Sequence, residues 1–204
     1  WMVFDDLSGK RWLKGAVLDS DLKTKTTFDI TPAEFGTAPS TFDVVAAGGA
    51  AGVVWSYASG VGNGIRYKAW NAAGCTLTAQ VEVAGFLVQA PVLTAASAGP
   101  IAAVAYANSN DNFRVRLLDI STGSLGPVRT YGPILSHPGI TPAPGGWRVA
   151  GIVAGSPKSS VSVLKLDGEL DILASLTSVG EVGGYSVPTR MAMNPAGTSG
   201  AVAW

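Results

Sequence analysis

One order of strand-like segments recurs about every 50 residues along the chain, and this repeat constrains the fold more than any other feature. Each copy opens with a short apolar segment and continues, after a loop, with a segment rich in β-branched and aromatic residues. The opening pairs span residues 2–5 and 11–19, 52–57 and 65–71, 102–106 and 113–119, and 148–153 and 161–167. Residues 200–204 repeat the opening segment once more. Such a chain is expected to stack similar units side by side.

The repeated segments have the patterns of β-strands. Residues 65–68 and 113–116 alternate apolar with basic side chains, which is the period of a half-buried strand. A turn with Gly or Asp leads from each pair to a third segment, and a fourth segment precedes the next copy. We name the four strands of each sheet A to D in their expected order across the sheet. The pair of segments that opens each copy forms strands B and C, and the third segment forms strand D. The fourth segment, which precedes the next copy, forms strand A of that next copy. The A strands are expected at 42–46, 91–95, 137–141 and 189–193, and the D strands at 26–30, 77–83, 127–131 and 172–176.

These units predict an all-β fold. One small sheet cannot bury both of its faces, whereas radially stacked sheets bury one another and leave few edges exposed. We therefore predict a β-propeller of four-stranded antiparallel blades, about four of them visible, as a single domain or segment over residues 1–204. The repeats are expected at 1–51, 52–100, 101–146 and 147–200, with a partial repeat at 201–204. The chain lacks the Gly-His…Trp-Asp signature of WD40 repeats and the Gly-Gly-Tyr/Trp pairing of kelch repeats.

The strand count is uneven at the two ends. The chain opens with a B strand that has no A strand before it, and it closes with an A strand followed by an extra B strand. It also begins at Trp1 without a signal peptide, so we expect a processed chain or a part of a longer one. We predict a section of a larger propeller, or an assembly through the unpaired strand ends. The alternative is a four-bladed ring closed by the last A strand, with residues 200–204 as an accessory strand.

Composition excludes several classes of function. Lys and Arg number 14, as do Asp and Glu, and no basic cluster follows a path of phosphates, so no nucleic-acid partner is expected. The longest apolar run, residues 44–55, is interrupted by glycine and shorter than the ~20 residues that span a bilayer, so no transmembrane segment is expected. A single cysteine, Cys75, excludes an internal disulfide. No catalytic, metal or cofactor motif is apparent, and none is predicted.

The longer loops are where binding is expected. Antiparallel order places the B–C and D–A loops on one rim, whereas the short A–B and C–D turns on the other rim look structural. One B–C loop is rich in oxygen donors, and we take as candidate binding residues Asn108, Asn110, Asp111 and Asn112. Calcium binding usually requires several carboxylates, and only Asp111 supplies one here, so calcium binding by this loop stays open.

A second set of candidates lies near the starts of the A strands. Asp43, His137 and Arg190 are expected to gather at one mouth of the propeller channel. A carboxylate, an imidazole and a guanidinium on one axis suit a sugar or a carboxylated ligand. With a second carboxylate they would suit hydrolysis, but no carboxylate stands at a matching position. The plainer interpretation is that His137 and Arg190 are rim residues bonded to backbone carbonyls.

The repeat has one resemblance. Residues 52–56, 65–70 and 113–126 follow the order Val-Val-Trp-Ser, loop, Ile-Arg-Tyr-Lys, and a turn with Gly-x-Leu. This order resembles the degenerate propeller repeats of exported bacterial surface proteins and lipoproteins. The resemblance implies export and a binding or scaffolding role. We therefore expect a non-catalytic module at the bacterial surface or outside the cell that binds protein or glycan through its B–C and D–A loops. A propeller glycan hydrolase and a structural segment of a large assembly are the alternatives.

Overall fold

The fold was obtained as a computed structural model. It describes residues 2–5, 11–18, 21–31, 38–59, 62–71, 76–87, 92–107, 113–132, 136–154, 158–182, 189–194, 196 and 198–204. Regular structure in these residues consists of β-strands, which confirms the predicted all-β fold. No helix in the part of the chain described is long and apolar enough to cross a membrane.

The strands form five antiparallel sheets in chain order. The first sheet contains β1 (Met2–Asp5), β2 (Arg11–Leu18) and β3 (Thr24–Asp29). The second contains β4 (Ala38–Ala47), β5 (Ala50–Ser59), β6 (Gly62–Asn71), β7 (Thr76–Leu77) and β8 (Val81–Leu87). Here β7 and β8 both pair with β6, so the expected D strand is split into two pieces.

The next two sheets are complete four-stranded meanders. The third contains β9 (Val92–Ala98), β10 (Ile101–Ala107), β11 (Phe113–Asp119) and β12 (Leu125–Tyr131). The fourth contains β13 (Ser136–Ala143), β14 (Gly146–Val153), β15 (Ser159–Asp167) and β16 (Ile172–Val182). The fifth has two strands, β17 (Arg190–Met193) and β18 (Gly200–Ala203). The order A to D is therefore present in the second, third and fourth sheets.

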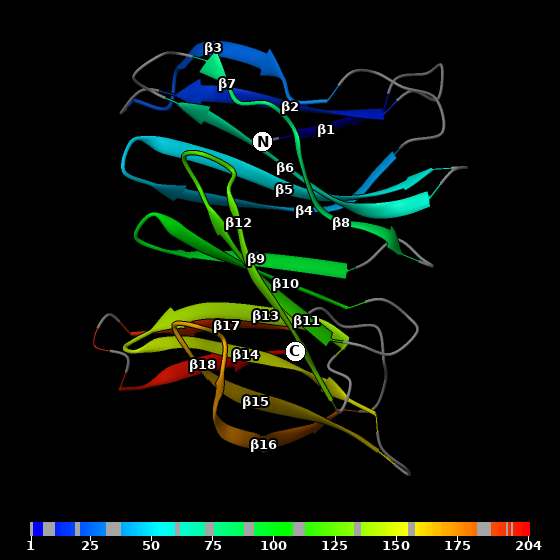
Figure 1. Ribbon diagram of the computed structural model, residues 1–204, viewed down its shortest axis with the longest axis vertical. Helices are drawn as coiled ribbons and strands as arrows, with labels where there is room; N and C mark the ends of the chain where they lie inside the picture. The colour runs from blue at the N-terminus through cyan, green and yellow to red at the C-terminus, as the bar shows by residue number, and fades with distance from the viewer. Residues whose placement is uncertain are drawn as a thin grey trace.

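The sheets stack on one another along the long axis of the molecule (Figure 1). The most extensive contacts between sheets join the A strands, namely β4 with β9, β9 with β13, and β13 with β17. The first sheet lies at one end of the stack and the fifth sheet lies against the fourth. The described strands do not close into a ring.

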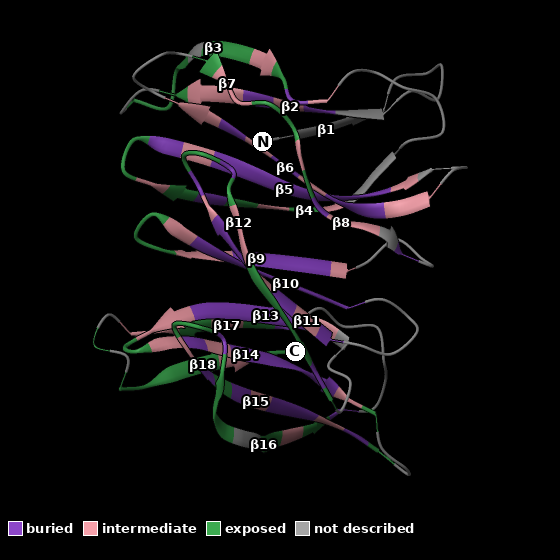
Figure 2. Ribbon diagram, in the orientation of Figure 1, coloured by how far each residue is buried: buried purple, intermediate pink, exposed green. Residues whose placement is uncertain are grey.

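Both faces of an internal sheet are buried. On β10, Ala102, Val104 and Tyr106 belong to an apolar cluster shared with the second sheet. The alternate residues Ala103 and Ala105 belong to a cluster shared with the fourth sheet. Successive side chains of a strand point to opposite faces, so β10 supplies two cores at once. Figure 2 shows the same concentration of buried residues in the strands inside the stack.

Tyrosine hydroxyls tie neighbouring sheets together. Tyr67 of the second sheet donates a hydrogen bond of 2.5 Å to the carbonyl of Ile120 in the third. Tyr131 of the third sheet donates one of 2.6 Å to the carbonyl of Leu170 in the fourth. Each acceptor carbonyl belongs to a residue in the turn between a C strand and a D strand. The side chains of these two residues, Ile120 and Leu170, are buried. Burial raises the pKa of both phenols above the ordinary value, so they remain donors.

Room for the Tyr67 ring depends on a glycine. A Cβ atom on Gly52 would lie within 2.5 Å of three atoms of the Tyr67 side chain. Any side chain at position 52 would therefore displace the ring from the hydroxyl's acceptor. Lys68, the residue after Tyr67, bonds to the sheet on the other side. Its Nζ atom donates a hydrogen bond of 3.1 Å to the carbonyl of Ile30 in the first sheet.

The C strands of the third and fourth sheets end at an aspartate that organises the following turn. Asp119 Oδ1 accepts hydrogen bonds from the backbone amides of Ser121 and Thr122 at 3.0 and 2.8 Å. Asp167 Oδ1 accepts from the amides of Glu169 and Asp171 at 2.9 and 2.7 Å. Such bonds favour the ionised carboxylate, and they hold the pKa of Asp119 below its ordinary value of 3.8.

The Tyr67 hydrogen bond is tested by Tyr67→Phe. We expect a loss of about 1–3 kcal/mol in the free energy of unfolding, because the buried Ile120 carbonyl loses its partner. Tyr57→Phe is the matched control, since the Tyr57 hydroxyl donates to the Glu82 carboxylate in a partly exposed place. Urea unfolding followed by circular dichroism measures both. Equal effects of the two substitutions would contradict a special role for Tyr67.

The Asp119 turn predicts a pH dependence of stability. Because its pKa is lowered on folding, ionised Asp119 stabilises the fold above its ordinary pKa of 3.8, and this contribution is lost as the pH falls through the folded value. We expect Asp119→Asn to lower the urea midpoint at about pH 6, and we expect this difference from the parent to become smaller as the pH is lowered toward about 2. A difference between variant and parent that is the same at both pH values would contradict this origin.

Candidate functional site

The four loop candidates lie outside the described residues. Asn108, Asn110, Asp111 and Asn112 fall between the end of β10 and the start of β11. Their binding role therefore stays a prediction. The same holds for most of the expected B–C and D–A rim, because the described residues contain mainly the strands and the opposite turns.

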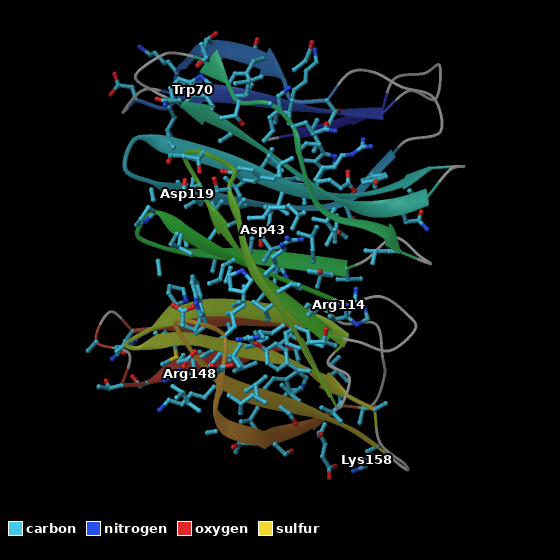
Figure 3. The ribbon with its side chains drawn as sticks, in the orientation of Figure 1. Asp43, Trp70, Arg114, Asp119, Arg148 and Lys158 are labelled. Atoms are coloured by element: carbon cyan, nitrogen blue, oxygen red, sulfur yellow. The ribbon has the colours of Figure 1, made fainter. Side chains whose placement is uncertain are left out.

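Asp43 lies on β4 and faces the neighbouring A strand. Its Oδ2 atom accepts hydrogen bonds from Thr94 Oγ1 at 3.0 Å and from the backbone amide of Ala95 at 2.9 Å. Thr94 and Ala95 are both buried on β9. Figure 3 shows Asp43 between the second and third sheets. In the described structure this carboxylate thus joins two A strands.

His137 and Arg190 lie on neighbouring A strands. The backbone amide of Thr189 donates to the His137 carbonyl at 3.2 Å, so the strands β13 and β17 meet at this level. His137 has a positive φ of 51°, and its Nδ1 atom is buried without a hydrogen-bond partner in the described structure. Arg190 is exposed and donates from Nη1 to the Thr189 carbonyl at 3.3 Å.

The three channel-mouth candidates are therefore placed in two groups. His137 and Arg190 come together, whereas Asp43 belongs to a different contact, with β9 lying between β4 and β13. The plainer interpretation of the sequence has both side chains bonded to backbone carbonyls. Arg190 bonds the carbonyl of Thr189, whereas His137 Nδ1 has no hydrogen-bond partner in the described structure. Binding by these three residues stays a prediction.

A groove of about 690 Å³ opens between the third and fourth sheets, at the rim of the A–B and C–D turns. Its apolar walls include Ile101, Leu117, Leu125, Pro127, Ala143 and Trp147. Trp147 is buried in the cluster shared by the two sheets and belongs to the inner wall. Glycines of both turns, Gly145 and Gly168 among them, leave backbone exposed to the opening. The sequence alone indicates a structural role for the short turns at this rim.

Two carboxylates stand at the opening of this groove. Asp119 and Glu169 come from equivalent C–D turns of the third and fourth sheets, and the described lining contains no Lys or Arg. Asp171 lies two residues beyond Glu169 and forms an exposed ion pair with Arg129 at 3.4 Å. An aspartate is ionised at neutral pH, and the turn amides and hydroxyls lower the pKa of Asp119 further below its ordinary value. The groove therefore combines an apolar interior with negative charge at its mouth.

The groove has no sequence motif. Its lining comes from four turns and strand ends spread over residues 98–169, each with ordinary turn composition. The recurring aspartate at the end of the C strands was a usable signal for the acidic opening. No group of three or more His, Cys, Asp or Glu side chains in the described residues is arranged to hold a metal ion.

The Asp43 contact predicts a stability effect. We expect Asp43→Ala to lower the free energy of unfolding by about 2 kcal/mol, since the buried Thr94 hydroxyl and Ala95 amide lose a charged acceptor. Asp29→Ala removes an exposed carboxylate from a 3.6 Å pair with Lys14 and should cost less than about 0.5 kcal/mol. Thermal and urea unfolding compare the two. An Asp43→Ala protein as stable as the parent would show that the contact between A strands is dispensable.

No protein-family model matches the chain, and no curated protein matches it significantly.

Proposed function

We propose that this chain is a non-catalytic module of β-propeller repeats that binds a segment of a partner protein in the groove between its third and fourth sheets. The propeller arrangement is supported by the A strands, which meet from sheet to sheet as the innermost strands of blades would. The order of strands A to D within each complete sheet supports it as well.

The groove is the observation that carries the binding role. Its volume of about 690 Å³ falls within the range of roughly 300–1,000 Å³ typical of ligand sites. Apolar side chains that remain accessible in a groove gain free energy when a partner covers them. The turns that frame the groove are fixed by the Asp119 and Asp167 hydrogen bonds, so the site is formed before binding.

Charge and polarity favour a peptide over a glycan. The lining is mostly aliphatic, and its aromatic residue Trp147 is too buried to offer a stacking face to a sugar ring. Ionised Asp119 and the neighbouring Glu169 complement a cation. We therefore propose an apolar segment that carries Lys or Arg. Export to the bacterial surface or beyond remains part of this proposal, supported by the resemblance of the repeat.

The proposal is tested with a defined probe, a blocked peptide of alternating Leu, Val and Lys residues, titrated into the isotopically labelled protein. We expect amide shifts of residues 117–127 and 143–147, and about tenfold weaker binding for Gly168→Leu, whose side chain would enter open space in the groove. Glu169→Gln should weaken binding at low salt more than at high salt.

The controls use the same chain. Gly132→Leu adds a side chain to an equally open position outside the groove and should leave binding unchanged. A peptide with Glu in place of Lys should bind poorly. If a neutral oligosaccharide shifts the amide signals of the groove and the Lys peptide does not, the partner is a glycan and not a protein. An absence of groove shifts with both probes would overturn the binding site.

A further inference from the structure

Two arginines of the third sheet point toward the second sheet. On β11 the alternate residues Phe113 and Val115 belong to the apolar cluster shared with the fourth sheet. Successive side chains of a strand point to opposite faces, so Arg114 and Arg116 lie on the face toward the second sheet. Arg116 Nη1 donates a hydrogen bond of 2.8 Å to the carbonyl of Val83 on β8, which agrees with this direction.

A buried tyrosine stands beside the two arginines. Tyr106 on β10 is directly opposite Arg114 in the register of the two strands, and its side chain is 3% exposed. Burial raises the pKa of the Tyr106 phenol, whereas the positive charges of Arg114 and Arg116 and a hydrogen bond with Arg114 oppose this rise. The three side chains therefore lie close together. Figure 3 labels Arg114, near the start of β11.

The outer strand of the third sheet keeps this place open to solvent. Thr130 and Val128 of β12 are opposite Arg114 and Arg116 in the register, so they share their face of the sheet. Thr130 is exposed, and Val128 is 44% exposed. Both arginines are themselves only partly buried. We call Arg114, Arg116 and Thr130 the arginine site.

The positive charge of this site is not balanced within the described residues. No carboxylate there forms an ion pair with either arginine. The described carboxylates of the second and third sheets are used elsewhere: Asp43 bonds to β9, and Asp119 holds its own turn. Glu82 forms an ion pair of 3.2 Å with Arg66. In the described structure the arginine site thus carries two cations and no anion.

Arg116 also has a donor without an acceptor. Its Nε atom is buried and has no hydrogen-bond partner in the described structure, while Nη1 is held by the Val83 carbonyl. A guanidinium has donors alone, and each one removed from water needs an acceptor. A cation that is already partly desolvated and held in place loses little more when it binds an anion. The second cation, two residues away, adds a repulsion that an anion would relieve.

We propose that the arginine site binds an oxyanion group of a ligand, that is a carboxylate, sulfate or phosphate, between the second and third sheets. The planar donors of a guanidinium match two oxygens of such a group at once. The Tyr106 hydroxyl and the Val83 carbonyl hold the two guanidinium groups in place, and the exposed Thr130 hydroxyl is a further donor. This site lies on the opposite face of the third sheet from the peptide groove and does not depend on it.

Titrations of the isotopically labelled protein with sodium sulfate, sodium phosphate and sodium acetate test the proposal, with sodium chloride holding the ionic strength constant. We expect saturable shifts of the backbone amides of residues 104–106, 114–116 and 128–130. Arg114→Gln should raise the half-saturation concentration at least about tenfold, because the amide keeps a donor but not the charge. Thr130→Val removes the hydroxyl from an exposed position and should raise it about threefold. Circular dichroism should show an unchanged fold for both variants.

Arg129→Gln is the matched control. Arg129 lies on β12 of the same sheet, but its guanidinium is 3.4 Å from Asp171, on the side of the fourth sheet. This variant should leave the titrations unchanged. If Arg129→Gln weakens binding as much as Arg114→Gln does, the effect is one of general surface charge and the proposal is overturned.

The three salts separate the possible ligand groups. Saturation by acetate alone assigns a carboxylate ligand, and saturation by sulfate or phosphate assigns a tetrahedral oxyanion. Shifts that do not saturate with any of the three overturn the site. The peptide groove is observed through the amides of residues 117–127 and 143–147, so a failure of either proposal is recognised separately.

Discussion

The third sheet of this protein is apolar on both faces, and the stack depends on giving each of these faces a neighbour. β10 illustrates the constraint, because Ala102 and Val104 pack toward one sheet while Ala103 and Ala105 pack toward the other. At about 25 cal/mol per Å² of apolar surface buried, a sheet with one bare face forgoes much of the stabilisation available to it. Small side chains suit this role, since they allow two sheets to approach the same strand closely.

Stacking by apolar contact alone would leave the relative position of the sheets loosely defined. Hydrogen bonds from long side chains to backbone carbonyls of the next sheet fix it. Tyr67 and Tyr131 donate forward to the turns of the following sheet, and Lys68 donates backward to the preceding one. Arg116 also donates backward, to the carbonyl of Val83 at 2.8 Å. Carbonyls at the edges of sheets are otherwise hard to satisfy away from water, so these bonds both satisfy them and select the neighbour.

The repeated strands can be predicted from the sequence, whereas the features that occur once in the chain cannot. The strands and their order follow from local alternation and turn residues, and the structure has them close to the expected bounds. The division of one D strand into β7 and β8 has no local signal, because it depends on which parts of β6 each of the two strands pairs with. The contact of Asp43 with Thr94 joins residues 51 positions apart, and no periodicity indicates it. The groove was missed for a similar reason, since its walls come from separate turns.

The acidic groove shows how a structural requirement can prepare a binding site. A C strand that ends at aspartate gains a turn held by the backbone amides, and this explains Asp119 and Asp167 without any ligand. Their charges then stand at the rim whether or not a partner exists. Glu169 is different, because the turn uses its backbone amide and not its carboxylate: it is the amide that donates to Asp167. A substitution at Asp119 would therefore disturb turn and charge together, whereas one at Glu169 changes the charge of the groove while the turn keeps its hydrogen bonds.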